Sequence, residues 1–276
     1  MYQEISLKTE NLVYTNTRSD RADLDYHMHC HNCFELYYLI TGNVEFYLDG
    51  MKTRPKPGTL LAIAPDVFHG VRALDGQMYH RIRLHFTEHQ LAEGDGQILL
   101  KTFQGGVCYL EEQFGIEWYF HAVEQCREYE KELQEIAIRT GLTLLLSRIS
   151  AISRKEPGRR RATPSKVQEV IAYINEHLNE RLTLEAIARD FFISKNHLTD
   201  IFKQATGTTV ANYILCKRMA LVRRELALGT PTAVAAERAG FGDYSSFFRA
   251  YKKLFGYPPS DRKGLELAEE DREEAF

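Results

Sequence analysis

The sequence has few cysteines and no long hydrophobic run, and these shortages exclude disulfide-stapled and membrane-spanning proteins. Its five cysteines among 276 residues are an odd number and widely spaced, which is typical of free thiols in a reducing compartment. The longest apolar runs lie near Leu142–Leu146 and fall far below the ~18 residues that span a bilayer. Charges interrupt the first apolar residues, so no signal peptide is visible. We therefore expect a cytoplasmic protein that does not enter a membrane.

The net charge of −3 is small, but it is unevenly distributed along the chain. Residues 1–163 carry 19 Lys and Arg against 22 Asp and Glu, whereas residues 164–264 carry 15 against 10 and residues 265–276 carry 1 against 6. An acidic tail thus masks a basic block in the total. A basic block of this size favours contact with a phosphate backbone, and the length of the chain predicts two domains.

A basic stretch that contains proline and glycine, residues 153–166, divides the chain into two parts. We interpret it as a hinge, with an additional phosphate contact through its arginines as the alternative. Before it, residues 117–152 have helical spacing. Their apolar stripe predicts either a dimer seam, which we favour, or intramolecular core; the stripe consists of Ile138, Leu142, Leu145, Ile149 and Ile152.

Short apolar and aromatic segments in residues 1–90 predict a small antiparallel β-barrel or sandwich. Residues 34–40 and 43–50 flank Thr41-Gly42, which we interpret as the turn of a hairpin. Residues 56–71 and 79–86 continue the pattern of strands.

Two similar units in residues 166–264 each predict a helix, a tight turn and a second helix. In the first unit, Thr183 and Ser194 are expected N-caps, and Gly207 ends the second helix. In the second unit, Thr230 and Asp243 are the expected N-caps, Gly240 supplies the turn and Gly256 ends the helix. A helix over residues 217–229 is expected to join the units.

These units resemble the DNA-binding domain of the AraC/XylS family of transcription regulators. In the second unit, the resemblance lies in Gly240-Phe241, Ser246-Phe247-Phe248-Arg249, Phe255-Gly256 and Pro259. In the first, it lies in Leu182-Thr183-Leu184, Ile187-Ala188, Phe202-Lys203 and Tyr213. The resemblance implies binding to double-stranded promoter DNA, action on RNA polymerase, homodimerisation and control by a small-molecule effector, with a sugar as our first expectation.

The resemblance also places DNA contacts on the second helix of each unit. Base contacts are expected from Asn196, Thr199 and Asp200, and from Tyr244, Ser245, Ser246 and Arg249. Phosphate contacts are expected from Lys195, Lys203, Lys252 and Lys253, and Ser194 and His197 complete the predicted interface. Asp200 departs from the family pattern, because a carboxylate repels phosphate; we expect it to accept from a cytosine amine or to turn away from the DNA.

The densest group of reactive side chains is His29-x-His31-x3-Glu35, followed by His69 after a proline. Alternation along a strand would direct His29, His31 and Glu35 to one side. Three imidazoles and one carboxylate suit a divalent metal, and the spacing resembles that of metal-bearing cupins. Regulators of this family commonly keep such residues without a metal, so we expect a ligand pocket first and a metal site second. Tyr37, Arg81 and Arg83 are further ligand-binding candidates.

The sequence thus predicts an α+β, two-domain protein. A cupin-like sensing barrel is expected in residues 1–152, with a helical dimerisation segment at residues 117–152. An all-α double helix-turn-helix domain is expected in residues 167–264, followed by an acidic tail in residues 265–276. We predict a ligand-controlled regulator that is not an enzyme and needs no cofactor. The alternatives are a metal-binding cupin domain with an enzymatic, metal-sensing or redox-sensing role fused to a DNA-binding module, and an N-terminal domain that only dimerises the protein.

Overall fold

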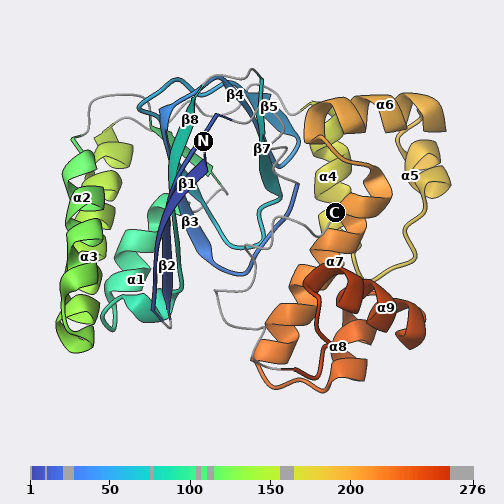
Figure 1. Ribbon diagram of the computed structural model, residues 1–276. Helices are drawn as coiled ribbons and strands as arrows, with labels where there is room; N and C mark the ends of the chain where they lie inside the picture. The colour runs from blue at the N-terminus through green and yellow to red at the C-terminus, as the bar shows by residue number, and fades with distance from the viewer. Residues whose placement is uncertain are drawn as a thin grey trace.

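The computed structural model describes residues 2–9, 11–20, 28–74, 78–103, 107–110, 115–155 and 165–261. Most of the expected linker and the whole acidic tail at residues 265–276 lie outside the described residues. The N-terminal part consists of two antiparallel sheets with helices on one side, and the C-terminal part is helical throughout (Figure 1). None of the described helices is long and apolar enough to cross a membrane.

Six strands form the larger sheet, in the order β1-β2-β8-β3-β6-β9. These strands are β1 (Tyr2–Lys8), β2 (Leu12–Ser19), β8 (Tyr79–Phe86), β3 (Phe34–Thr41), β6 (Leu60–Ile63) and β9 (Val107–Leu110). The smaller sheet has the order β5-β4-β7 and consists of β5 (Met51–Thr53), β4 (Val44–Leu48) and β7 (His69–Ala73).

The hairpin expected at Thr41-Gly42 is wrong. The hydrogen-bonding edges of β3 are taken by β6 and β8, so the chain leaves the larger sheet at Gly42, where φ is +125°, and enters the smaller one as β4. The actual tight hairpin joins β4 to β5 through Asp49-Gly50, with Leu48 opposite Met51. Both turn residues have positive φ, +42° and +78°, as a two-residue turn of this kind requires.

Side chains of the larger sheet alternate between a helix-covered face and the space between the sheets. Ile82, Leu84 and Phe86 of β8 belong to the apolar cluster under the helices, while Tyr79 of the same strand packs between the sheets. The covering helices are α1 (Asp95–Leu99), α2 (Glu117–Gln125) and α3 (Lys131–Lys155), with short 3-10 turns at η1 (Glu88–Gln90), η2 (Leu100–Phe103) and η3 (Cys126–Glu128).

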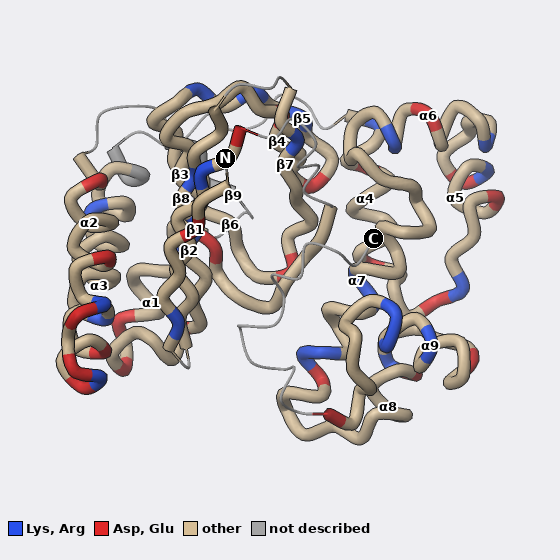
Figure 2. Tube along the Cα trace, viewed as in Figure 1, with Lys and Arg blue, Asp and Glu red and all other residues tan. Residues whose placement is uncertain are grey.

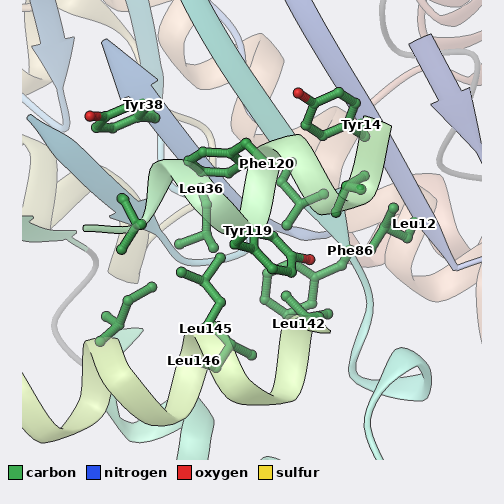
Figure 3. Close-up of a cluster of buried hydrophobic side chains, with 14 of the residues drawn as sticks. Leu12, Tyr14, Leu36, Tyr38, Phe86, Tyr119, Phe120, Leu142, Leu145 and Leu146 are labelled. Atoms are coloured by element: carbon green, nitrogen blue, oxygen red, sulfur yellow. The ribbon is translucent and has the colours of Figure 1, made fainter. Parts of the chain in front are cut away.

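The apolar stripe of α3 lies in this intramolecular core. Leu142 and Leu145 are fully buried against α2 and the sheet, in the cluster that contains Leu36 and Phe86 (Figure 3). Ile138 is fully buried in the same cluster. The stripe is therefore not the dimer seam that its periodicity favoured, because the larger sheet of the same chain covers it.

Six helices lie in described residues 165–261: α4 (Lys166–Glu176), α5 (Leu184–Asp190), α6 (Lys195–Thr206), α7 (Val210–Ala227), α8 (Thr232–Arg238) and α9 (Tyr244–Phe255). Two separate clusters of buried side chains organise them. The first half of α7, including Tyr213, belongs to one cluster, and its second half, including Met219 and Leu226, belongs to the other. α7 therefore joins the two helix-turn-helix units and starts earlier than the helix expected over residues 217–229.

Local capping explains where these helices begin and end. Thr183, Ser194 and Asp243 each accept a hydrogen bond from the backbone three residues on, and Gly207 and Gly256 end their helices with positive φ. The cap expected at Thr230 is wrong. Pro231 occupies that position without a side-chain cap, and the Thr230 hydroxyl donates to Glu225 at 3.0 Å instead.

Candidate DNA-binding and ligand-binding sites

The second helix of each unit, α6 and α9, has one buried face and one exposed polar face. Leu198 and Phe202 of α6, and Phe247 and Tyr251 of α9, are fully buried. Exposed on the opposite sides are the predicted contacts Lys195, Asn196, His197, Asp200, Lys203, Tyr244, Ser245, Ser246, Arg249, Lys252 and Lys253. Lysines and arginines occur along α6, α7 and α9 (Figure 2). This arrangement suits insertion of a helix into a DNA groove.

Several of the predicted DNA contacts already have partners within the protein. The Lys195 ammonium pairs with Glu185 of α5 at 2.9 Å, and the Thr199 hydroxyl donates to the Lys195 carbonyl. Arg249 donates to the Ser246 hydroxyl at 3.2 Å. All three contacts are at the surface, where such interactions are weak enough to exchange for DNA.

A histidine cluster surrounds Glu35 inside the N-terminal domain. Nε2 atoms of His31, His69 and His85 lie 2.9, 2.8 and 3.2 Å from the same carboxylate oxygen, Oε2. One ligand atom from each of His29, His31, Glu35 and His69 lies within 4.8 Å of the others. The four residues predicted from the spacing therefore lie together. They do not share one strand, because β3 begins only at Phe34 and His29 pairs with His69 of β7 through an isolated bridge.

Burial and charge oppose each other at Glu35. Burial by itself raises the pKa of this carboxyl, but the nearby imidazoles of His69 and His85 and the hydrogen bond with His31 outweigh it and hold the pKa well below its usual range. The Glu35 carboxyl is therefore ionised at neutral pH.

The orientation of the imidazoles fits a metal ion. Nδ1 of His69 is 2.8 Å from the Val67 carbonyl, and Nδ1 of His31 is 3.2 Å from the Cys33 carbonyl. A neutral imidazole that donates from Nδ1 presents a lone pair at Nε2, and here that lone pair faces a carboxylate oxygen. A proton on Nε2, or a divalent ion held by these side chains, would make this contact favourable. Carbonyl-oriented imidazoles of this kind are common among metal ligands.

His85 belongs to the cluster but was missed by the sequence prediction. It lies directly opposite Glu35 in the register of β8 with β3. The sequence contains a signal for His85. Residues 81, 83 and 85 alternate along one strand, so if Arg81 and Arg83 point to the interior, position 85 must point the same way.

The remaining ligand-binding candidates line the same interior. Arg81 and Arg83 are 1% and 8% exposed, and they lie opposite Thr17 and Thr15 of β2. Tyr37 lies opposite Arg83 on β3, and its hydroxyl is 2.7 Å from that of Tyr79. The interior thus combines buried arginines and hydroxyls with an apolar wall.

Two family models match this chain. Residues 17–149 match the AraC-like ligand binding domain, and residues 187–263 match a helix-turn-helix domain. The regulatory protein SoxS of Escherichia coli is 30% identical over 96 residues, which cover 34% of this chain and 90% of SoxS. The chain belongs to the AraC family of transcription regulators. It therefore combines an N-terminal ligand-binding domain with a C-terminal helix-turn-helix DNA-binding domain.

Similarity extends over most of the chain in other proteins. The transcriptional regulator YobQ of Bacillus subtilis is 24% identical over 239 residues, covering 85% of this chain and 87% of YobQ. The crystal structure of ToxT from Vibrio cholerae O395 is 10% identical, covers 94% of this chain and 100% of that chain, and has a TM-score of 0.42.

Proposed function

We propose that this AraC-family regulator is controlled by an acidic, hydroxylated small molecule, such as a sugar acid, that binds between the two sheets. The observation that carries the proposal is the pair of buried arginines on β8, with threonine and tyrosine hydroxyls opposite them on β2 and β3. Guanidinium groups bind carboxylates with two parallel hydrogen bonds, and hydroxyls suit the hydroxyls of a sugar.

A thermal-shift panel tests this proposal. Neutral sugars, sugar acids and simple carboxylic acids are each added to the full chain. A sugar acid at about 1,000 times its Kd should stabilise the protein by about 4 kcal/mol. Arg83→Gln should remove the shift, while Arg54→Gln, at an exposed arginine that pairs with Glu45, should retain it. Stabilisation by neutral sugars alone would contradict the acidic class, and no stabilisation by any compound would favour a domain that only dimerises.

For the DNA-binding domain, we propose base contacts by Asn196 and Arg249 and phosphate contacts by Lys203, Lys252 and Lys253. Asn reads adenine and Arg reads guanine through paired hydrogen bonds. We further propose that the promoter-bound protein activates RNA polymerase. Selection of binding sites from random duplexes, followed by transcription in vitro with and without the protein, measures both activities; unchanged or reduced transcript from the selected promoter would contradict activation.

We propose that the protein is a homodimer that associates through the outer face of α3, with a second copy of the chain as the occupant. Leu133, Ile136 and Leu144 are 57%, 51% and 54% exposed on the helix whose opposite face is core. Charged substitution of Ile136 and Leu144 by lysine should give monomers in sedimentation experiments, while Leu228→Lys, at the end of α7, should not. A monomeric wild-type protein, or dimers that persist in the α3 variant, would contradict this surface.

A second candidate function is metal sensing, which the convergence of His29, His31, Glu35 and His69 specifically favours. These residues would hold a divalent ion, which would supply a positive charge at Glu35 and fix the imidazoles around it. Because the relatives are regulators, sensing is favoured over catalysis. Elemental analysis should find about one metal ion per chain in the wild type and much less in Glu35→Gln; purified protein without stoichiometric metal would exclude this function.

A further inference from the structure

Two short segments, residues 28–31 and 66–69, lie between the histidine cluster and the first helix-turn-helix unit. Successive side chains of these segments contact the cluster and the unit in turn. Along residues 28–31, His29 and His31 point to the cluster, while Met28 and Cys30 pack against the core of the first unit. The Cys30 thiol lies 3.5 Å from the Cys216 carbonyl of α7. Neighbouring residues of one segment thus contact different domains, as expected for extended backbone.

The same alternation occurs at Phe68 and His69. The imidazole of His69 contacts Glu35, whereas the Phe68 ring is fully buried in the cluster formed by α4, α5, α6 and α7. Its centroid is 4.8 Å from that of Tyr213, in an edge-on arrangement. An aromatic side chain of the sensing domain therefore completes the hydrophobic core of the first DNA-binding unit.

Hydrogen bonds hold the two segments to each other and to α7. His29 and His69 exchange both backbone hydrogen bonds, each at 2.9 Å. The Asp49 amide donates to the Phe68 carbonyl at 2.7 Å, and the Asp49 carboxylate accepts from the Tyr213 hydroxyl at 3.0 Å. The Lys217 ammonium of α7 donates to the Asp66 carbonyl. These contacts connect the backbone on both sides of Phe68 to α7.

This docking also restricts α6. Its exposed residues Asp200, Lys203 and Gln204 line a cavity of about 620 Å³ whose opposite wall includes Lys52 and Arg72 of the smaller sheet. A recognition helix enters a groove about 12 Å wide and 8.5 Å deep, with phosphates on both sides. The smaller sheet lies beside α6 where such a duplex would have to lie, so we expect Asp200 and Lys203 to contact DNA after the two domains move apart.

We propose that residues 28–31 and 66–69 form a coupling element between the histidine cluster and the first helix-turn-helix unit. A change in the groups around Glu35 shifts His29 and His69, displaces Met28, Cys30 and Phe68, and thereby releases or tightens the contact with α4 and α7. This inference rests on the proposed function, since it supplies the route by which an occupied sensor alters DNA binding. Coupling of this kind acts in both directions with equal free energy.

Hydrogen exchange of the full chain, measured by mass spectrometry without added ligand, tests the coupling. Glu35→Gln removes the charge at the centre of the cluster and keeps the volume of the side chain. The control is Glu124→Gln on α2, a carboxylate that accepts from Tyr14 at 2.6 Å on the helix-covered side of the larger sheet. We expect Glu35→Gln to accelerate exchange in residues 167–174 and 210–217 at least tenfold, and Glu124→Gln to leave it unchanged.

A second comparison isolates the route. In a Phe68→Leu background, Glu35→Gln should accelerate exchange in α4 and α7 much less than in the wild type, because the transmitting contact is weakened. Faster exchange confined to β3 and β8 would overturn the coupling, and so would an equal effect in both backgrounds.

If Glu35→Gln does not fold, the reverse direction remains measurable. Tyr213→Phe removes only the hydroxyl that donates to Asp49, and it should shift the ring NMR signals of His29 and His69. Unchanged signals would overturn the coupling. Because these experiments use no effector, their failure is distinct from that of the proposed function, which the thermal-shift panel decides.

Discussion

Gly240, in the turn of the second helix-turn-helix unit, is expected to tolerate no side chain. Its φ is +84°, and a Cβ added there would lie 2.3 Å from the Leu178 carbonyl oxygen and 2.9 Å from the Asn179 Cα. Both are backbone atoms of the connection between α4 and α5, so they cannot rotate away as a side chain would. The Leu178 oxygen also accepts from Arg218 Nε at 2.9 Å.

Gly229 is a matched control for Gly240→Ala. It has the same φ of +84°, but a Cβ added there meets nothing within 4 Å. Alanine at Gly229 should therefore lower the free energy of unfolding by about 1–2 kcal/mol, because only the left-handed backbone conformation disfavours it. Alanine at Gly240 adds a steric overlap of about 1–3 kcal/mol and disturbs a charge-assisted hydrogen bond. Together these effects predict a difference of about 3 kcal/mol between the variants.

Urea denaturation followed by far-UV circular dichroism measures this difference. With a slope of about 1–3 kcal/mol/M, Gly240→Ala should unfold at a midpoint about 1–3 M below that of Gly229→Ala. The close approach at Gly240 places the second unit against the first, so DNA affinity should fall with it. Equal midpoints would contradict a steric role for Gly240, because its backbone conformation alone would then account for the glycine.

Further predictions concern the predicted DNA interface. Arg249→Ala should weaken binding to a selected site by about 1–3 kcal/mol in fluorescence anisotropy, and unchanged affinity would contradict base contact by α9. Lys252→Ala should instead weaken binding to all duplexes and reduce the slope of log K against log salt by about 0.9; an unchanged slope would exclude a phosphate contact. Hydrogen bonds from Ser246 lower the pKa of the Asp243 carboxyl below its usual 3.8. The ionised cap therefore stabilises α9 above pH 3.8, and this stabilisation is lost as the pH falls through the lower pKa of the folded protein. The Ser246 amide signal should follow this loss in NMR, and Asp243→Asn, which caps without titrating there, should abolish the pH dependence.

Local chemistry made the helix-turn-helix units predictable from the sequence. Caps at Ser194 and Asp243 and stops at Gly207 and Gly256 depend on residues within one turn, so their pattern is independent of the rest of the fold. Other local patterns gave wrong predictions. Thr41-Gly42 separates two apolar segments as a hairpin turn would, but the strands it joins pair in different sheets.

The periods of helix and strand fix which face of α3 is apolar and which histidines could share a strand face, so both relations could be predicted from the sequence. What those faces contact depends on the tertiary structure. The α3 stripe is covered by the larger sheet, and His85 reaches Glu35 from another strand. Phe68 has the sequence context of a strand residue, yet it fills the core of the DNA-binding domain. Contacts between segments that lie far apart in the chain depend on how whole surfaces pack, and no local period encodes that.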